Sequence, residues 1–426
     1  MHSKVKITGD NGIKKNIWIW NHYATNTFKD QGGRHYWLAE NLIKNGYNAT
    51  VFCASTIHTS LENIDTGKKK YILDTVNSIP YVFIKTPLYA GNGLQRIKNM
   101  VAFYLNLFPV TREYAKCYGK PDIILASSVH PLTLVAGIKI ARKFGIPCIC
   151  EVRDLWPESI VASGFLKKNS IVYKILHQGE KWIYKNADSL VMTCEGNKDY
   201  IIEQGWEKDV PLEKIHYICN GIMLDAFDKN SEENPVIDSD LDDPRYKNIV
   251  YAGAVRKANN IGMIIDAAKI IQDKGIEGIR FLIYGNGDEV EPLQRRCKAE
   301  HIHNVIFKGH VAKKYIPSIV KKAYINILHA NSIFYKYGQS QNKMFEYLAA
   351  GRCIIQTYQA AYGICDKYHC GIVLPDQNSE EIAKTAIMLF YDEEKCNTMG
   401  KNARQASYEF DFKKLTEKLI SIIENI

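Results

Sequence analysis

The sequence lacks the patterns that mark several large classes of protein. No segment approaches the run of about 18 apolar residues that a membrane-spanning helix needs, and no apolar stretch with a small-residue cleavage site follows Met1. None of the 11 cysteines forms a Cys-x-x-Cys pair, so we expect free thiols in a reducing compartment and no zinc site. We therefore expect a globular protein that is neither secreted nor integral to a membrane.

Two common nucleotide-binding motifs are also missing. The chain has no Gly-x-Gly-x-x-Gly and no Gly-x-x-x-x-Gly-Lys-[Ser/Thr], which disfavours a nicotinamide dinucleotide site and a P-loop. Aromatic residues are not interleaved with Lys and Arg in a ribonucleoprotein-type motif, and no zinc-finger spacing occurs. Nucleic acid is therefore an unfavoured partner, although the net charge of +9 alone allows it.

What the chain does have is ordinary globular composition and considerable length. Its 426 residues exceed the roughly 250–300 residues at which one core usually splits, and a hydrophobic content of 46% supplies a large core. Two domains are therefore expected. The basic excess suits a partner that carries phosphate, such as nucleic acid, anionic lipid or a phosphorylated small molecule.

Short apolar runs alternate with amphipathic stretches along the whole chain. In the first half, this alternation predicts strands at 16–20, 49–53, 122–126, 146–151 and 189–193 and helices at 31–44, 131–144 and 170–185. In the second half, it predicts strands at 249–252, 280–284, 304–308, 325–328 and 352–356 and helices at 261–272, 289–300, 315–322 and 342–350. Apolar strands need cover on both faces, so we expect two doubly wound, Rossmann-like α/β domains facing a central cleft.

The domain boundaries follow from the same pattern. Residues 1–228 are predicted to form an N-terminal domain and residues 246–405 a C-terminal domain. Between them, residues 229–245 are rich in Asp and Glu and contain proline, which predicts a solvated acidic linker. The remaining segment, 406–426, is expected to be a helix that returns to pack on the N-terminal domain.

Polar residues at the ends of predicted strands are candidates for a ligand site in the first half. Gly32 and Gly33 precede a helix, where backbone N–H groups and the helix dipole favour an anion, although a tight turn is an equally good explanation. His130 follows a strand, and its ring is expected to donate to a phosphate or a sugar hydroxyl, or to be an ordinary loop residue. Asp154, within 151–159, follows the next strand, with a salt-bridged loop as the alternative.

The second half offers a clearer combination of charges. Gly253 comes directly after a strand, so Arg256 and Lys257 are placed to meet a phosphate at the edge of the sheet. Lys343 and Glu346 share one face of the predicted helix 342–350, a pairing that suits a diphosphate and a ribose diol. An ordinary surface ion pair is the alternative.

Together these segments resemble the family-4 retaining glycosyltransferases of the GT-B fold. The segments that carry the resemblance, in the family's order and spacing, are Gly32-Gly33, Glu151–Ser159, Asn220-Gly221, Tyr251-Ala252-Gly253 and Ser340–Gly351. The heptapeptide Arg153–Ser159 is similar to the branch that includes the bacterial O-antigen and capsule N-acetylfucosamine transferases. The resemblance extends from about Asn16 to the C-terminus.

The resemblance implies a role for each candidate residue. Lys257 and Lys343 would neutralise the diphosphate of a UDP-sugar, and Glu346 would accept from the ribose hydroxyls. His130 and Asp154 would face the sugar or the acceptor. The other residues expected at the nucleotide sugar are Gly32, Gly33, Gly253, Arg256, Gly285, Val311, Ser340 and Asn342. No cofactor and no metal are expected, because we recognise no Asp-x-Asp motif of the kind that holds a divalent ion on a sugar diphosphate.

One position departs from the family pattern. Many members carry two glutamates eight positions apart, and counting back from Glu346 reaches Gly338. The carboxylate that often contacts a hydroxyl of the donor sugar is therefore absent. Backbone N–H groups of Gln339 and Ser340 are the expected substitutes.

The expected activity is metal-independent transfer, with retention, of an N-acetylated hexosamine or deoxyhexosamine from a UDP-sugar. The expected acceptor is an undecaprenyl-diphosphate-linked saccharide in O-antigen or capsule synthesis. Apolar and basic residues in 94–120 predict a cytoplasmic protein that is peripheral on the anionic inner face of the membrane, with a buried core helix as the alternative. The competing functions are a UDP-sugar 2-epimerase of the same fold and a non-catalytic UDP-binding scaffold.

Overall fold

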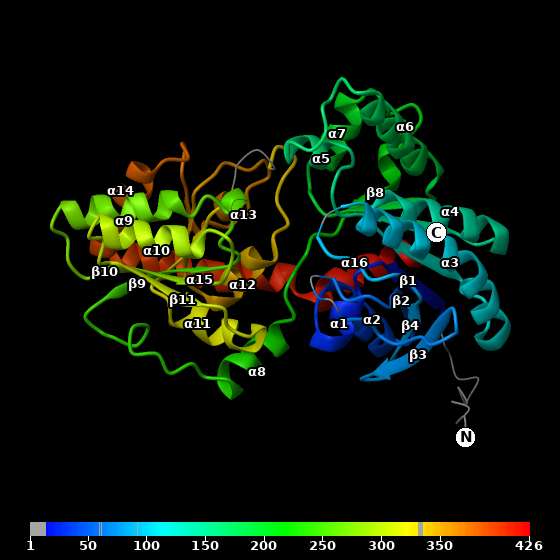
Figure 1. Ribbon diagram of the computed structural model, residues 1–426, viewed down its shortest axis with the longest axis horizontal. Helices are drawn as coiled ribbons and strands as arrows, with labels where there is room; N and C mark the ends of the chain where they lie inside the picture. The colour runs from blue at the N-terminus through cyan, green and yellow to red at the C-terminus, as the bar shows by residue number, and fades with distance from the viewer. Residues whose placement is uncertain (1–13, 59, 61, 92, 331–334) are drawn as a thin grey trace. The chain divides into compact units, whose positions relative to one another are not determined.

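Two α/β units make up the protein, as the sequence predicts. The computed structural model describes residues 14–426 apart from 59, 61, 92 and 331–334 (Figure 1). Unit 1 comprises the described residues up to Thr193 together with Ile201–Ile218 and Thr416–Ile426, and unit 2 comprises Cys194–Tyr200 and Cys219–Leu415. The short helix α7 (Asn197–Glu203) and the C-terminal helix α16 (Phe412–Glu424) each contribute residues to both units.

The sheet of unit 1 has eight strands in the order β3-β4-β2-β1-β5-β6-β7-β8. The strands are β1 (Asn16–Asn21), β2 (Asn48–Ala54), β3 (Tyr71–Val76), β4 (Ile79–Ile84), β5 (Ile123–Ser127), β6 (Cys148–Val152), β7 (Ser189–Met192) and β8 (Ile215–Tyr217). All neighbours are parallel except the hairpin of β3 and β4, whose turn residues Asn77 and Ser78 both have positive φ. The sequence pattern does not indicate this hairpin, because β3 is an edge strand with no fully buried side chain and the turn lacks the usual glycine.

Helices cover both faces of this sheet, which explains why its central strands are mostly apolar. The helix α2 (Arg34–Lys44) lies on one side, and α3 (Leu94–Tyr118), α4 (Pro131–Phe144) and α6 (Ile171–Asn186) lie on the other (Figure 1). Two shorter helices, α1 (Thr25–Asp30) and α5 (Glu158–Ala162), follow the ends of β1 and β6, and the short helix η1 (Leu212–Lys214) precedes β8. The side chains of β1 from Ile17 to Trp20 are completely buried.

The sheet of unit 2 has six strands, all parallel, in the order β11-β10-β9-β12-β13-β14. The strands are β9 (Lys247–Ala252), β10 (Ile279–Tyr284), β11 (Val305–Gly309), β12 (Ile325–Leu328), β13 (Cys353–Gln356) and β14 (Gly371–Val373). The helices α9 (Gly262–Asp273), α10 (Val290–Ala299) and α14 (Ser379–Tyr391) cover one face, and α11 (Ile316–Lys322) and α12 (Asn342–Ala350) the other (Figure 1). The other helical segments of this unit are α8 (Leu224–Glu233), η2 (Lys257–Asn259), η3 (Lys313–Tyr315), α13 (Ile364–Tyr368), α15 (Glu393–Ser407) and η5 (Tyr408–Phe410).

Each sheet has one point at which the order of its strands reverses. In unit 1 the chain proceeds outward from β1 to β2 and then returns to place β5 on the other side of β1. In unit 2 the same reversal falls between β9 and β12. Ligands of open α/β sheets bind beyond the carboxyl ends of the strands at such points. The segments after β1 and β5, and after β9 and β12, are therefore where a site is expected.

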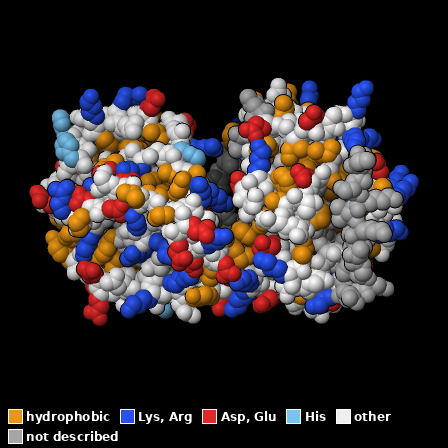
Figure 2. Space-filling view, turned by 90° about the horizontal axis from the view of Figure 1, so that it is seen from below, with side chains coloured by type: hydrophobic (Ala, Val, Ile, Leu, Met, Phe, Trp, Pro, Cys, Tyr) orange, Lys and Arg blue, Asp and Glu red, His pale blue; other side chains and the backbone are white. Residues whose placement is uncertain are grey.

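The acidic stretch 229–245 lies within unit 2 and does not separate the two units, in contrast to the predicted linker, although its side chains are largely exposed or partly exposed, as predicted. Lys308 Nζ is 2.8 Å from Asp238 Oδ1 and 2.8 Å from Asp240 Oδ2, and Lys322 Nζ is 2.5 Å from Asp242 Oδ1. Two Asp-x-Asp triplets, 238–240 and 240–242, occur here, and these contacts occupy their carboxylates. Figure 2 shows acidic side chains interspersed with Lys and Arg on the face that it presents. The stretch therefore neutralises basic residues of its own unit.

Candidate functional site

A buried polar cluster lies at the carboxyl ends of β1, β5 and β6 in unit 1. Glu151, on β6, accepts a hydrogen bond from Arg34 Nε at 2.8 Å and one from Ser127 Oγ at 2.6 Å. His35 Nε2 lies 2.9 Å from the same Ser127 oxygen. Burial alone raises the pKa of Glu151, but the Arg34 charge and the hydrogen bonds from His35 and Arg34 outweigh it and hold the pKa well below its usual value. Glu151 is thus an ionised, fully paired carboxylate.

The two glycines predicted to close on the phosphates lie just before α2. Gly33 has a φ of 99°, a conformation that favours glycine, and a Cβ there would lie 3.2 Å from Thr27 Cγ2. The turn brings Arg34 and His35 into the first turn of the helix and so into the polar cluster. The need for a tight turn is therefore sufficient to explain Gly33, and the contact of Gly32 and Gly33 with phosphate stays a prediction.

His130 is buried at the start of α4, beside a second histidine, His22, that is not among the predicted site residues. Its Nε2 lies 2.7 Å from Nδ1 of His22, and His22 Nε2 lies 2.6 Å from Asn99 Oδ1. Burial, with Arg96 nearby, lowers the pKa of His130 to about 3, so the ring is neutral at physiological pH. His22 follows the buried strand β1 just as His130 follows β5, so the same signal identifies both residues. Asp154, by contrast, is exposed on the loop after β6.

The centre of the candidate site in unit 2 is the ammonium group of Lys343. This residue lies in the first turn of α12, and its Nζ donates to Tyr251 OH at 3.2 Å and lies 4.5 Å from the centroid of that ring. A Cβ on Gly253 would lie 3.0 Å from the same nitrogen. Burial lowers the pKa of Lys343 to about 8, with Glu346 acting in the opposite direction. The result is a partly desolvated cation at the carboxyl end of β9.

Glu346 lies one turn farther along α12. Burial raises its pKa, while Lys313 and Lys343 act to lower it. The helix is tied to the strand by the next residue, because the backbone N–H of Ala252 donates to Tyr347 OH at 2.9 Å. The structure therefore brings together the Lys343, Glu346 and Gly253 that the sequence predicts at one site.

The glycines after β9 and β10 pack backbone against backbone. A Cβ on Gly285 would lie 1.8 Å from the carbonyl oxygen of Gly253, and one on Gly287 would lie 2.0 Å from that of Val255. Gly253 N donates to Tyr284 O at 2.9 Å, and Val255 N donates to Asn286 O at 3.0 Å. Close approach of the two strand ends therefore requires glycine here, whatever ligand binds above them.

The other predicted residues of unit 2 lie on the loops at this edge of the sheet. Arg256 and Lys257 have exposed side chains after β9, and Val311 follows β11. The structure thus places these residues near the expected edge, and their contact with a nucleotide stays a prediction.

The segment before α12 explains the departure at position 338. Gly338 has a φ of 111°, which side chains rarely tolerate, so a glutamate does not fit this backbone without strain. Asn220 fixes the next turn, because its N–H donates to Ser340 Oγ at 2.7 Å and its amide donates to Ser340 O at 2.6 Å. Asn342, the first residue of α12, is exposed. We find no group of three or more His, Cys, Asp or Glu residues that could hold a metal in the part of the chain that the structure describes.

Comparison with known proteins identifies both halves of the chain. The family described as "Glycosyltransferase Family 4" matches residues 36–226, and the one described as "Glycosyl transferases group 1" matches residues 237–406. The chain belongs to these glycosyltransferases. The first matched region includes Ser127 and Glu151 of the polar cluster and begins just after Arg34 and His35. The second begins within the acidic stretch and includes the Lys343 site of unit 2.

Two curated relatives support this assignment. The glycosyltransferase is 24% identical over 265 residues to "Uncharacterized glycosyltransferase MJ1069" of Methanocaldococcus jannaschii. The aligned region covers 61% of this chain and 64% of the relative. It is 22% identical over 193 residues to "Probable glycosyltransferase WbjE" of Pseudomonas aeruginosa, and this aligned region covers 45% of this chain and 46% of the relative. The chain thus spans about half to two thirds of the length of these relatives, and neither name specifies an N-acetylfucosamine branch.

Solved structures with the same fold match nearly the whole glycosyltransferase. Sucrose-phosphate synthase from Thermosynechococcus elongatus has a TM-score of 0.70 at 16% identity, with 97% of this chain and 99% of that chain covered. Anabaena Alr3699/HepE in complex with UDP has a TM-score of 0.67 at 14% identity, with coverages of 96% and 100%. WaaG, a glycosyltransferase involved in lipopolysaccharide biosynthesis, has a TM-score of 0.62 at 12% identity, with coverages of 96% and 99%. The fold is therefore GT-B, as predicted.

Proposed function

We propose that this protein transfers a sugar from a UDP-sugar with retention of anomeric configuration. The observation that carries the proposal is the ammonium group of Lys343, which lies against Tyr251 at the strand reversal of unit 2. Burial makes its charge costly, so an anion bound there gains a strong, preorganised partner. The family assignment, and the presence of UDP in the HepE structure of the same fold, support a nucleoside diphosphate as that anion.

The proposed reaction breaks the bond between the anomeric carbon and the oxygen of the β-phosphate. Negative charge then develops on the leaving diphosphate, where Lys343 and Lys257 stabilise it without a metal. The acceptor hydroxyl attacks from the face that the diphosphate leaves, and its proton passes to the departing phosphate. Glu346 accepts from the ribose hydroxyls, while Arg256, Gly285 and Val311 complete the nucleotide site.

The proposed donor is an N-acetylated hexosamine or deoxyhexosamine. This donor rests on the resemblance of the heptapeptide Arg153–Ser159 to the N-acetylfucosamine transferases. In the segment before α12, Gly338 has no side chain to contact the sugar, and Asn220 holds Ser340 through two hydrogen bonds. Backbone N–H groups of Gln339 and Ser340 are positioned by this turn and replace the carboxylate of other family members. His130 and Asp154 of unit 1 face the sugar or the acceptor.

We further propose a lipid-linked saccharide as the acceptor, reached at an anionic membrane surface. No helix within the described ranges has the length and apolarity to cross a bilayer. One face of α3 is buried, as expected for a core helix. The other face exposes Leu94 (76%), Ile97 (55%) and Leu105 (57%), as expected for an interfacial helix. The helix thus has features of both alternatives. The involvement of WaaG in lipopolysaccharide biosynthesis agrees with such an acceptor.

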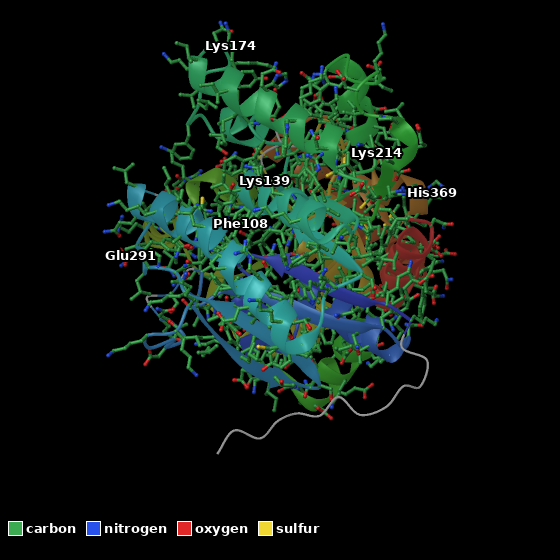
Figure 3. The ribbon with its side chains drawn as sticks, turned by 90° about the vertical axis from the view of Figure 1, so that its right-hand side faces the viewer. Phe108, Lys139, Lys174, Lys214, Glu291 and His369 are labelled. Carbon is green, nitrogen blue, oxygen red and sulfur yellow. The ribbon has the colours of Figure 1, made fainter. Side chains whose placement is uncertain are left out.

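A second apolar surface lies near the start of α6 in the same unit. Phe165 and Ile171 are exposed by 83% and 76%, and exposed Lys167, Lys168 and Lys174 accompany them. In Figure 3, Phe108 of α3, Lys139 of α4 and Lys174 of α6 are seen on these three helices. Apolar side chains among lysines suit the headgroup region of an anionic membrane.

A direct test combines donor binding with transfer. UDP should raise the melting temperature of the wild type, and a screen of UDP-sugars with an undecaprenyl-diphosphate saccharide should show transfer with one of them. Lys343→Ala should lower kcat by about 10²-fold or more, the effect of losing one preorganised cation. Lys269→Ala is the matched control, because Lys269 pairs only with Asp273 on the surface of α9 in the hydrogen-bond and ion-pair network of the described residues.

Each competing function predicts a different result in the same screen. Formation of an epimer from the UDP-sugar without an acceptor would indicate a 2-epimerase. Stabilisation by UDP with no product from any donor and acceptor would indicate a scaffold. Unchanged transfer by Lys343→Ala would refute the assigned role of that residue.

A further inference from the structure

The hydrogen bonds around Asn99 fix the orientation of its side-chain amide. The Nδ2 atom of Asn99, on α3, lies 2.6 Å from the carbonyl oxygen of Pro87 and 3.1 Å from Thr56 Oγ1. A carbonyl oxygen accepts and never donates, so the atom facing Pro87 is the NH₂ group. The other amide atom, Oδ1, therefore faces His22 Nε2 at 2.6 Å.

This orientation determines which nitrogen of each histidine carries the proton. An amide oxygen only accepts, so His22 Nε2 is the donor. Burial lowers the pKa of His22 well below its usual value, with His130 acting in the same direction, so the ring is neutral and its Nδ1 is an acceptor. His130 Nε2 lies 2.7 Å from that Nδ1 and must therefore donate to it. In neutral His130 the remaining nitrogen, Nδ1, is left as a lone-pair acceptor.

His130 Nδ1 is buried, and it has no hydrogen-bond partner in the described part of the chain. Leaving a buried acceptor unsatisfied costs about 1–3 kcal/mol, and His130 Nδ1 lies at the carboxyl end of β5, where a ligand of this sheet is expected to bind and can supply the missing donor. The group has to donate a hydrogen bond, as a hydroxyl does. A fully ionised phosphate oxygen presents only lone pairs and would be repelled.

We propose that Asn99 and His22 are positioning residues that hold His130 in the Nε2–H tautomer, so that its Nδ1 accepts a hydrogen bond from a substrate hydroxyl. From the sequence we expect the His130 ring to donate a hydrogen bond to a phosphate or a sugar hydroxyl. The geometry indicates the opposite direction, in which His130 Nδ1 accepts a hydrogen bond. The identity of the hydroxyl as that of a sugar rests on the proposed function. The relay Asn99–His22–His130 itself rests on the contacts and the neutral, buried rings within unit 1, and not on the identity of the substrate.

The tautomer of His130 can be measured without any substrate. In protein labelled with ¹⁵N-histidine, nitrogen–proton correlations through two and three bonds distinguish the two neutral tautomers, and His130→Phe assigns the signal. We expect a single Nε2–H tautomer for His130 in the wild type at neutral pH. A proton on Nδ1, or a charged ring, would overturn the proposal.

Two variants at the same packing site test the relay. His22→Phe keeps a flat ring against Phe103, whose centroid lies 4.6 Å from that of His22, but removes the acceptor for His130 Nε2–H. We expect the His130 signal to become a mixture of tautomers, and kcat/KM for transfer to fall by about tenfold or more. Phe103→Leu is the control, because it changes the packing of His22 without removing a ring nitrogen, and it should leave the single tautomer intact. An unchanged tautomer in His22→Phe contradicts the relay.

The outcome separates this proposal from the proposed function. If no donor is transferred but His130 has the expected tautomer and loses it in His22→Phe, the relay is supported and the transferase assignment fails. If sugar is transferred while His130 carries its proton on Nδ1, the relay fails alone. UDP binding should be unaffected in His22→Phe, because the proposed diphosphate cation Lys343 belongs to unit 2.

Discussion

Glu151 and Arg34 form an ion pair that solvent hardly reaches, with side chains exposed by only 1% and 3%. Breaking such a pair from one side leaves an uncompensated buried charge, so we expect Glu151→Gln to lower the free energy of unfolding by about 3–5 kcal/mol. Glu62→Gln is the control, since the pair of Glu62 with Lys29 is exposed and should contribute less than about 1 kcal/mol. Urea denaturation measures both. Equal effects in the two variants would contradict the importance of burial.

The pH dependence of this pair has a definite sign. The folded-state pKa of Glu151 is held below its usual value, so its stabilising contribution is complete above that usual value. It is lost as the pH falls through the folded-state pKa. The acid limb of the stability profile should therefore be shallower in Glu151→Gln than in the wild type.

The pKa of Lys343 leads to a prediction at alkaline pH. The free enzyme needs a cationic Lys343 to bind the diphosphate, and this pKa is lowered by burial to about 8. The value of kcat/KM for the UDP-sugar should therefore fall as the pH rises through about 8. In Lys343→Arg the charge persists, and this alkaline limb should disappear even if overall activity is reduced. A wild-type profile that is level well above pH 8 would contradict the assignment.

The sequence predicts the position of a single site residue where it also predicts the end of the preceding strand or the helix that contains the residue. His130, Gly253 and Lys343 lie where the sequence places them, because strong apolar runs precede them or a helical pattern contains them. The local sequence pattern does not indicate their partners. Asn99 and Tyr251 are identified as site residues only by contacts between segments far apart in the chain, with His22 and Lys343 respectively.

Among elements, α3 permits a test of membrane association that avoids the polar cluster. Replacing Leu94 and Ile97 together with glutamate should abolish co-sedimentation with anionic liposomes, because both side chains are exposed and apolar. Arg96 is unsuitable for this purpose, since its Nε donates to Tyr23 OH at 2.9 Å. Tyr391→Glu, at another exposed apolar position on α14 of unit 2, is the control and should still sediment. If the wild type never sediments with liposomes, the peripheral-membrane proposal is wrong.

The junction of β9 and β10 provides a second test at this scale. Gly285→Ala should destabilise unit 2 severely, because the added carbon would lie 1.8 Å from Gly253 O. Gly275→Ala, where φ is also positive but no atom lies within 4 Å of the added carbon, should cost only about 1–2 kcal/mol of backbone strain. The melting temperatures of the two variants separate the effect of close contact, in Gly285→Ala, from that of backbone strain, in Gly275→Ala. A similar loss in the two would show that the strand ends can separate.

Element boundaries followed the strength of the local signal. The predicted limits of α4, β12 and α12 agree with the structure, since each combines a clear apolar pattern with a proline, glycine or polar residue at its end. The helix predicted at 31–44 begins instead at Arg34, because the positive φ of Gly33 prevents an earlier start. The hairpin of β3 and β4 depends on pairing at the edge of a sheet, for which the sequence pattern is weak.

At the scale of the whole molecule, the acidic stretch changes how the net charge is distributed. The sequence pattern predicts that the seven acidic residues of 228–243 lie in a solvated linker, which would leave the folded units more basic than the net charge indicates. Instead Lys308, Lys322 and Arg404 pair with Asp238, Asp242 and Asp228 inside unit 2. Their partners lie tens of residues away in the chain, which is why local composition alone predicted a linker.

Hydrogen exchange on the intact protein tests the location of the donor site. UDP should slow the exchange of amides after β9 and at the start of α12, in the segments 253–257 and 339–344, because the proposed diphosphate binds between them. The amides around His22 and His130 should change little with UDP alone. Protection confined to unit 1 would contradict the proposed nucleotide site.

The division of the chain also bears on how the protein is made. Unit 1 includes Thr416–Ile426, where Ile423 O accepts from Lys15 Nζ and Glu424 accepts from Tyr47 OH at 2.6 Å. These residues follow all of unit 2, so they leave the ribosome after it. During synthesis, the sheet of unit 1 therefore lacks the part of α16 that belongs to unit 1 until unit 2 has been translated. Unit 1 therefore cannot complete its fold before unit 2 has been translated.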